Sequence, residues 1–235
     1  MAYEIKKAAV LGAGVMGATI AAHLTNAGIE CFLLDIIPFE LTEADKAQGL
    51  TEKSPAWRNR FAANGLAGVV KSKPAGFYSK KNASMIKVGN FEDNLNWLAE
   101  VDWVIEVVVE NLKIKQELFA KVEKVVRPNC IVTTNTSGIP IKDITAKFGA
   151  KLKEHFLGTH FFNPPRYMKL LEIIPGQNTK PEVVSYMTRF CEQVLGKGVV
   201  ICKDVPNFIG NRIGSFDISN AIRLTVQKNL KLDEA

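Results

Sequence analysis

A glycine-rich segment near the start of the chain constrains its fold more than any other feature. Residues 8–17 read Ala-Ala-Val-Leu-Gly-Ala-Gly-Val-Met-Gly, the pattern of a buried strand, a tight turn and the beginning of a helix. In such a turn Gly12 permits the tight bend, Gly14 lets the backbone approach a bound group, and Gly17 lets the helix pack closely on the strand. The segment therefore predicts a βαβ unit that binds a dinucleotide pyrophosphate at a helix N-terminus.

Asp35 indicates which dinucleotide this would be. It stands eighteen residues after Gly17, at the end of the next predicted strand. A carboxylate there accepts hydrogen bonds from a ribose 2′-OH and repels a 2′-phosphate, and the following Ile36 and Ile37 supply no compensating arginine. The sequence therefore predicts NAD rather than NADP as cofactor. The alternative is that Asp35 is only a loop carboxylate after a strand.

Short apolar runs alternate with segments of helical periodicity, which is typical of an α/β fold. We predict a Rossmann-type doubly wound, mostly parallel sheet. Strands are expected at residues 8–12, 31–35, 101–109, 130–134, 156–162, 168–174 and 198–203. Helices are expected at residues 15–27, 114–126 and 179–196, the last beginning with a capping box at Thr179-Lys-Pro-Glu182.

Two regions depart from this alternation. Residues 37–90 are polar and rich in Lys, Ser, Asn and Gly, so we expect an inserted helical excursion with loops that interrupts the doubly wound pattern. Near the end, three apolar residues recur at helical spacing: Ile209, Ile213 and Phe216. We therefore expect an NAD-binding domain over residues 1–204 and, over 205–235, the first helix of a truncated C-terminal helical domain.

Composition excludes several classes of protein. The formal net charge of +6 favours anionic ligands, but no run of Lys and Arg supports nucleic-acid binding. The chain has no signal-peptide pattern and no apolar run long enough to span a bilayer, so a cytoplasmic protein is expected. No metal site is predicted, and the cysteines lack CxxC spacing, which indicates reduced, buried thiols: Cys31, Cys130, Cys191 and Cys202.

His160 and Glu172 form the strongest candidate for a reacting pair. Glu172 lies in a mostly apolar strand, where an unpaired carboxylate would be costly to bury, so a partner is expected. His160 is the best candidate, because a carboxylate that holds one ring nitrogen orients a histidine general base. The alternative partners are Lys169 and Arg166, which would make a plain structural ion pair.

Other polar residues are more ambiguous. Ser137 follows a predicted strand, at the edge where open α/β sheets bind ligands, but it could equally be an N-cap for a helix starting near Pro140. His23, on the helix after the glycine turn, is expected to be a packing residue, whereas His155 is expected at the surface.

Six motifs, taken in order, give the chain a family resemblance. They are Gly12-Ala-Gly-Val-Met-Gly17, Val-Val-Glu110-Asn-Leu-Lys-Ile-Lys115, Asn-Thr-Ser137, His160-Phe-Phe-Asn163-Pro, Met-Lys-Leu-Leu-Glu172 and Asn-Phe-Ile-Gly-Asn211-Arg. Together they resemble the NAD-binding domain of the L-3-hydroxyacyl-CoA dehydrogenases, over residues 5 to about 225 apart from the middle insertion. The long bacterial and archaeal members, some fused to an enoyl-CoA hydratase, are the most similar.

The resemblance implies a set of roles. His160 would take the proton from a 3-hydroxyl, Glu172 would orient His160, and Ser137 and Asn211 would bind the reacting oxygen and the thioester end of an acyl-CoA substrate. The cofactor positions that match are Gly12, Gly14, Val15, Met16, Gly17, Asp35, Glu110, Lys115 and Asn163. The family's C-terminal helical domain closes the acyl pocket and forms a homodimer, so a protein of only these residues is expected to bind NAD but to turn over poorly.

Departures from the family limit what is carried over. Gly138 stands where many members have a second serine, and Pro165-Arg166 replaces a commoner small apolar pair; both are expected to change loop shape rather than chemistry. Residues 37–90 differ in length from the family's CoA-contacting hairpin, so no CoA contact is assigned there. Two other functions stay open: a dehydrogenase of a hydroxy acid without CoA, and a non-catalytic NAD-binding module.

Overall fold

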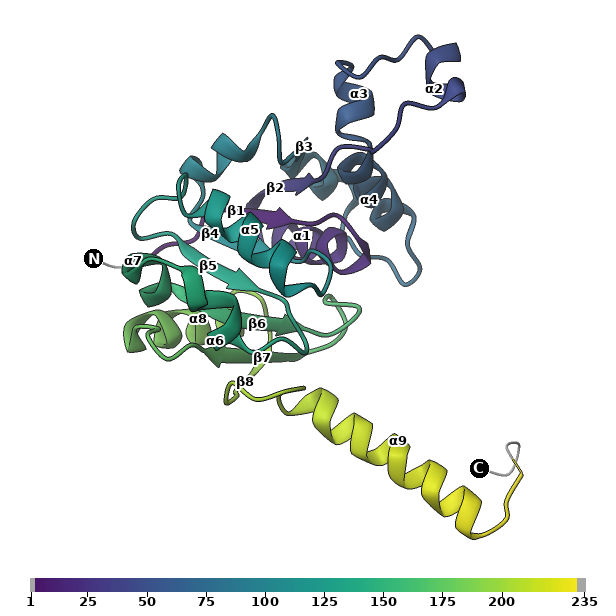
Figure 1. Ribbon diagram of the computed structural model, residues 1–235, viewed down its shortest axis with the longest axis vertical. Helices are drawn as coiled ribbons and strands as arrows, with labels where there is room; N and C mark the ends of the chain where they lie inside the picture. Colours follow the sequence, from purple (N-terminus) through teal and green to yellow (C-terminus); the bar gives the residue numbers. More distant parts are fainter. Residues whose placement is uncertain (1–2, 232–235) are drawn as a thin grey trace.

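The strands of the chain form a single eight-stranded sheet in the computed structural model, which describes residues 3–231 (Figure 1). Its order is β3-β2-β1-β4-β5-β6-β7-β8, and every neighbouring pair is parallel except β6 and β7. The strands are β1 (Lys7–Leu11), β2 (Glu30–Asp35), β3 (Ile86–Asn90), β4 (Trp103–Glu106), β5 (Ile131–Thr134), β6 (Phe156–Phe161), β7 (Leu170–Pro175) and β8 (Gly198–Ile201). This confirms the predicted Rossmann-type α/β fold.

Helices cover both faces of the sheet. Three of them pack on one face: α1 (Val15–Asn26), α4 (Arg60–Lys71) and α8 (Pro181–Gln193). Three lie on the other: α5 (Leu112–Val122), α6 (Ile141–Ile144) and α7 (Ala150–Glu154). The remaining helical elements are α2 (Glu43–Ala47), α3 (Pro55–Arg58), α9 (Gly210–Gln227) and the 3₁₀ turns η1 (Lys80–Met85), η2 (Leu95–Glu100) and η3 (Thr145–Lys147).

The central strands are buried on both faces because their side chains alternate between two cores. Ala8 and Val10 of β1 pack into the core under α1, whereas Ala9 and Leu11 pack into the core under α5. An uninterrupted apolar sequence is what a strand covered on both sides requires. The carboxyl ends of β1, β2, β4, β5 and β6 therefore meet at one edge, where the candidate residues lie.

The prediction for residues 37–90 was wrong in its main point. The segment does contain helices, but α4 packs against α1 and leads into β3, which pairs in parallel with β2. It therefore contains the next regular helix and strand of the doubly wound sheet, and only α2 and α3 extend away from the body (Figure 1). The sequence concealed this because β3 reads Ile-Lys-Val-Gly-Asn, a short edge strand with little apolar signal.

Several smaller expectations also need correction. Lys180 precedes α8 without a side-chain cap, and the Thr179 hydroxyl instead donates to the carbonyl oxygen of Phe156, so the predicted capping box is absent. His155 is buried rather than exposed, with Nδ1 3.0 Å from the carbonyl oxygen of Lys151. The β4 run was predicted at nine residues, but only Trp103–Glu106 pairs as a strand.

The end of the described chain is a long helix that points away from the sheet (Figure 1). Helix α9 follows Pro206 as predicted, and no residue in it is buried. Its membership of a second domain stays a prediction. All four cysteines are free and buried, as expected. Within residues 3–231, no helix combines the length and apolarity that crossing a bilayer needs.

Candidate active site

The glycine turn has the geometry that its sequence predicts. Gly12 has φ +107°, and a Cβ there would lie 2.6 Å from the carbonyl oxygen of Val107. A Cβ on Gly17 would collide with the carbonyl oxygen of Gly12, so the helix packs closely on the turn only because residue 17 is glycine. A Cβ on Gly14 would meet nothing within 4 Å. That open face, at the start of α1, is the surface a pyrophosphate needs.

Asp35 links the end of β2 to this turn. Its Oδ2 accepts a hydrogen bond from the Ala13 amide at 2.6 Å, and its Oδ1 accepts one from the Ile36 amide at 2.7 Å. Each carboxylate oxygen retains a lone pair for a ribose hydroxyl. Beside the turn, Val15 is exposed, Met16 is half-buried, and a groove of about 400 Å³ runs between α1 and α4. These residues fit a nicotinamide dinucleotide.

His160 and Glu172 form a buried pair, as predicted. Antiparallel pairing of β6 with β7 places the two residues directly opposite each other, and His160 Nδ1 lies 2.7 Å from Glu172 Oε2. His160 is 6% exposed and Glu172 is 0% exposed. The alternative partner Arg166 instead donates to backbone carbonyl oxygens elsewhere. The Nε2 atom of His160 is therefore free to exchange a proton while Glu172 holds the other nitrogen.

Glu172 also holds the beginning of α9. Its Oε1 accepts hydrogen bonds from the amides of Ile209 at 2.9 Å and Gly210 at 2.7 Å. Asn211 is the next residue, so the same carboxylate that orients His160 fixes the helix turn that carries Asn211. Burial alone would raise the pKa of Glu172, but the hydrogen bonds from His160, Gly210 and Ile209 bring the pKa below its usual value of 4.5.

This shift predicts an acid-side loss of stability. An acid whose pKa is lowered by folding stabilises the native state above its unfolded pKa and loses that contribution as the pH falls through the lower, folded value. Stability should therefore fall below about pH 4.5 in the wild type. Glu172→Gln should lower the free energy of unfolding by about 2 kcal/mol at pH 7, and the stability of this variant should fall less steeply at acidic pH. Urea unfolding from pH 3 to pH 7 checks this. An equally steep loss of stability at acidic pH in the variant and the wild type would contradict it.

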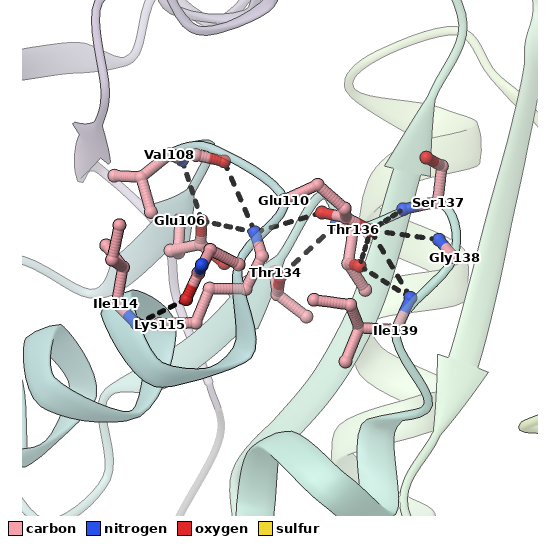
Figure 2. A network of polar contacts seen from close by, with 11 residues as sticks. Glu106, Val108, Glu110, Ile114, Lys115, Thr134, Thr136, Ser137, Gly138 and Ile139 are labelled. Carbon is pink, nitrogen blue, oxygen red and sulfur yellow. Dashed lines mark hydrogen bonds and ion pairs between the residues drawn. The ribbon is translucent and has the colours of Figure 1, made fainter.

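A buried ion pair lies behind the turn after β4 (Figure 2). Lys115, on α5, is 1% exposed, and its ammonium has three acceptors: Glu106 Oε1 at 2.8 Å, Val108 O at 3.3 Å and Glu110 Oε2 at 3.3 Å. Glu106 is 0% exposed and also accepts from the Thr134 hydroxyl and the Val108 amide. Burial raises the pKa of Glu106, against the opposing effect of Lys115.

Glu110 extends this network to the loop that carries Ser137 (Figure 2). Its Oε1 accepts from the Thr136 hydroxyl and from three consecutive amides, those of Ser137 at 3.2 Å, Gly138 at 3.0 Å and Ile139 at 3.3 Å. Although burial acts to raise the pKa of Glu110, these hydrogen bonds and Lys115 lower it. The ionised carboxylate thus holds the loop in one conformation.

Ser137 is not a helix cap. Helix α6 begins after Pro140, and the carboxylate of Asp204 accepts from the amides of Ile141 at 2.7 Å and Lys142 at 2.9 Å. The structural alternative for Ser137 was therefore wrong, and its half-buried hydroxyl remains available at the carboxyl edge of β5. Asn163 is exposed in the loop after β6.

Several residues that hold the site were not predicted from the sequence. They are Glu106, Thr134, Thr136 and Asn135, whose Oδ1 accepts from the Phe161 amide at 2.9 Å. Glu106 carried a usable signal, because a carboxylate inside an apolar strand must have a partner, and the same argument identified Glu172. Among residues 3–231 no cluster of His, Cys, Asp and Glu could hold a metal ion.

Comparison with known proteins agrees with this geometry. Residues 7–205 match the model of the family described as 3-hydroxyacyl-CoA dehydrogenase, NAD binding domain. A probable 3-hydroxyacyl-CoA dehydrogenase of Bacillus subtilis is 51% identical over 97% of this chain, which covers 28% of that protein. One from Deinococcus radiodurans is 46% identical over 94% of the chain, which covers 60% of it. The chain thus spans less than two thirds of these relatives.

Solved structures show the same likeness. FadB2 of M. tuberculosis is 30% identical with a TM-score of 0.74, over 97% of this chain and 74% of that one. The 3-hydroxybutyryl-CoA dehydrogenase of Escherichia coli K12 is 29% identical with a TM-score of 0.73, over 97% of this chain and 44% of that one. The glycine turn, the His160–Glu172 pair and these matches agree that the chain belongs to the 3-hydroxyacyl-CoA dehydrogenase family, through its NAD-binding domain.

Proposed function

We propose that the chain takes part in the NAD-dependent oxidation of (S)-3-hydroxyacyl-CoA to 3-oxoacyl-CoA in fatty-acid β-oxidation, with His160 as general base. The observation that carries this proposal is the buried contact of 2.7 Å between His160 Nδ1 and Glu172 Oε2. A histidine held in this way has one nitrogen oriented by a carboxylate and the other available for proton transfer, which is the arrangement of a general base.

The residues of the pair have separate tasks. His160 Nε2 accepts the proton of the substrate 3-hydroxyl, and the C–H bond of the same carbon breaks as the carbonyl forms. The acceptor for that hydride would be supplied by NAD held at the glycine turn and Asp35. Glu172 keeps the ring oriented and stabilises the imidazolium that forms, because its lowered pKa keeps it ionised at neutral pH. Phe162 and Phe208 lie against the ring, with centroids at 4.6 Å and 5.8 Å, and exclude water from it.

Ser137 and Asn211 complete the proposed substrate site. The Glu110 carboxylate accepts from the Ser137 amide, and the buried Glu172 carboxylate accepts from the Gly210 amide just before Asn211, so a carboxylate holds the backbone at each position. In this proposal their hydrogen bonds bind the reacting oxygen and the thioester, which stabilises charge that develops there.

The proposed cofactor site has two parts. The glycine turn and the strand end after it would hold the pyrophosphate and the adenosine ribose, through Gly12, Gly14, Val15, Met16, Gly17 and Asp35. Glu110 and Asn163 would hold the nicotinamide ribose and ring. Lys115 belongs to this part chiefly through Glu110, since its ammonium is buried and its three donors already have acceptors. A homodimer formed through a further helical domain is part of the same proposal.

Two glycine variants test the cofactor site separately from the fold. Gly14→Ala should fold like the wild type, since its Cβ has open space, but bind NADH at least about tenfold more weakly because the pyrophosphate loses its close approach. Gly17→Ala should instead destabilise the protein by about 2 kcal/mol or more, because its Cβ collides with Gly12. Thermal unfolding and NADH fluorescence titration check both. Equal NADH affinity for Gly14→Ala and the wild type would contradict the site.

The substrate class is tested by the reverse reaction. Reduction of acetoacetyl-CoA by NADH should be measurable with the enzyme in excess, and free CoA should compete with the substrate. If acetoacetate is reduced as fast as acetoacetyl-CoA under the same conditions, and free CoA does not inhibit, the result would instead favour a hydroxy-acid dehydrogenase that does not recognise CoA.

A further inference from the structure

The loop between β6 and β7, residues 162–169, is joined to the segment after α4, residues 72–79. One guanidinium nitrogen of Arg166, Nη1, donates to the carbonyl oxygens of Ala75 at 2.7 Å and Phe77 at 2.8 Å. The Tyr167 hydroxyl donates to the same Ala75 oxygen at 3.1 Å. These three bonds connect segments that are far apart in the sequence. We call these contacts of Arg166 and Tyr167 with residues 75–77 the Arg166 clamp.

Two aromatic rings also contact the guanidinium. Its central carbon lies 4.3 Å from the ring centroid of Tyr78 and 5.1 Å from that of Tyr167. A guanidinium attracts the face of an aromatic ring and donates in fixed directions, whereas a lysine ammonium supplies only a point charge. The Arg166 clamp therefore specifies both the distance and the orientation between its two segments.

Residues 72–79 are in turn attached to helix α1 and follow helix α4, which packs on the glycine turn. Asn26, the last residue of α1, donates from Nδ2 to the Gly76 carbonyl oxygen at 2.9 Å and accepts from the Tyr78 amide at 2.8 Å. Helix α4 packs so closely on the glycine turn that a Cβ on Gly65 would collide with the Ala13 carbonyl oxygen. Residues 72–79 are thus fixed relative to α1 and the glycine turn.

The loop 162–169 has an internal anchor as well. The buried ammonium of Lys197 donates to the carbonyl oxygens of Pro165 and of Met168, the latter at 3.0 Å. Burial lowers the pKa of Lys197 to about 8. Asn163 lies at the start of this loop, just after the strand of His160. The loop is therefore held from inside by Lys197 and from outside by Arg166.

We propose that Arg166 is a positioning residue, which fixes the Asn163 loop relative to the glycine turn and so preserves the spacing between the two parts of the cofactor site. This inference rests on the proposed function. Arg166 was expected to alter loop shape or to pair with Glu172, but its hydrogen bonds instead join this loop to residues 75 and 77. Since the clamp does not touch His160 or Glu172, its loss should weaken cofactor binding and leave the proton-transfer step unchanged.

The experiment compares Arg166→Gln with Arg166→Lys, with Arg189→Gln as control for an exposed arginine on α8. Arg166→Gln should raise the Kd for NADH about tenfold, since loss of a positioning contact propagates to the binding geometry. Hydrogen–deuterium exchange should increase in the peptides that cover residues 72–79 and in those that cover residues 162–169. Arg166→Lys should recover part of the affinity, and the pH dependence of turnover should match the wild type in all three variants.

Failure of the positioning role and failure of the proposed function would give different results. Unchanged exchange in residues 162–169, or an NADH Kd within twofold of the wild type despite increased exchange, would overturn the positioning role. If the wild type itself binds no NADH, the proposed function fails and the cofactor part of this inference fails with it, while the exchange comparison still decides whether Arg166 joins the two segments. Should Arg166→Gln not fold, Arg166→Lys and Tyr167→Phe provide the same comparison with smaller expected changes.

Discussion

His160→Ala is expected to slow the single-turnover reduction of acetoacetyl-CoA by NADH at least about 100-fold, the usual cost of removing a general acid–base group. In this direction the protonated imidazole gives its proton to the new hydroxyl. The affinity for NADH should stay within twofold of the wild type, because the proposed pyrophosphate and ribose contacts are unaffected. Stopped-flow measurement of NADH absorbance, with the enzyme in excess, resolves a slow reaction.

Matched histidine variants make this result specific. His160→Gln keeps a polar side chain beside Glu172 but cannot transfer the proton, so it should be as slow as His160→Ala. His155→Gln changes another buried histidine, which contacts the Lys151 carbonyl oxygen and the Tyr3 ring, and should keep the wild-type rate. A His160→Ala protein that retains a tenth or more of the wild-type rate would contradict the assignment of His160 as the general base.

Lys115→Met should lower the free energy of unfolding by about 3–5 kcal/mol at pH 7, because it leaves the Glu106 carboxylate buried without its cation. The loss of Lys115 also removes an effect that lowers the pKa of Glu106, so this pKa rises further. An acid with a raised folded pKa costs stability at higher pH and recovers it as the pH falls. The deficit should therefore shrink between pH 7 and about pH 5, as measured by urea unfolding.

Two controls distinguish the effect on stability of an unpaired buried charge from the effect of losing a long side chain. The double variant Glu106→Gln/Lys115→Met removes both charges and should regain most of the lost stability. Lys113→Met changes an exposed lysine on the same helix, 4.0 Å from Glu117, and should change stability by less than about 1 kcal/mol. A Lys115→Met deficit no larger than that of Lys113→Met would contradict the importance of the network.

The parts of the fold that could be predicted carried strong local signals. The glycine turn has its three glycines at positions where a side chain would collide or where a ligand needs space, so the sequence pattern and the geometry agree. The His160–Glu172 pair was predictable because a carboxylate in an apolar strand needs a partner, and the antiparallel register of β6 and β7 supplies it.

The parts that could not be predicted depend on contacts across the sheet. Nothing near Glu110 in the sequence shows that its carboxylate meets three amides of residues 137–139, because that contact arises only when β4 and β5 pair. The strand β3 lay at a sheet edge with few apolar residues, so its pairing with β2 was invisible to a hydrophobic pattern. The contacts of Arg166 with residues 75 and 77 are likewise set by tertiary structure alone.

The most direct test of the central claim, that this chain is an NAD-binding dehydrogenase domain, is a fluorescence titration of the wild-type chain with NADH and, separately, with NADPH. We predict saturable binding of NADH and much weaker binding of NADPH, because the Asp35 carboxylate would accept a hydrogen bond from a ribose hydroxyl and would repel a 2′-phosphate. Absence of saturable NADH binding, or equal affinity for the two nucleotides, would contradict it.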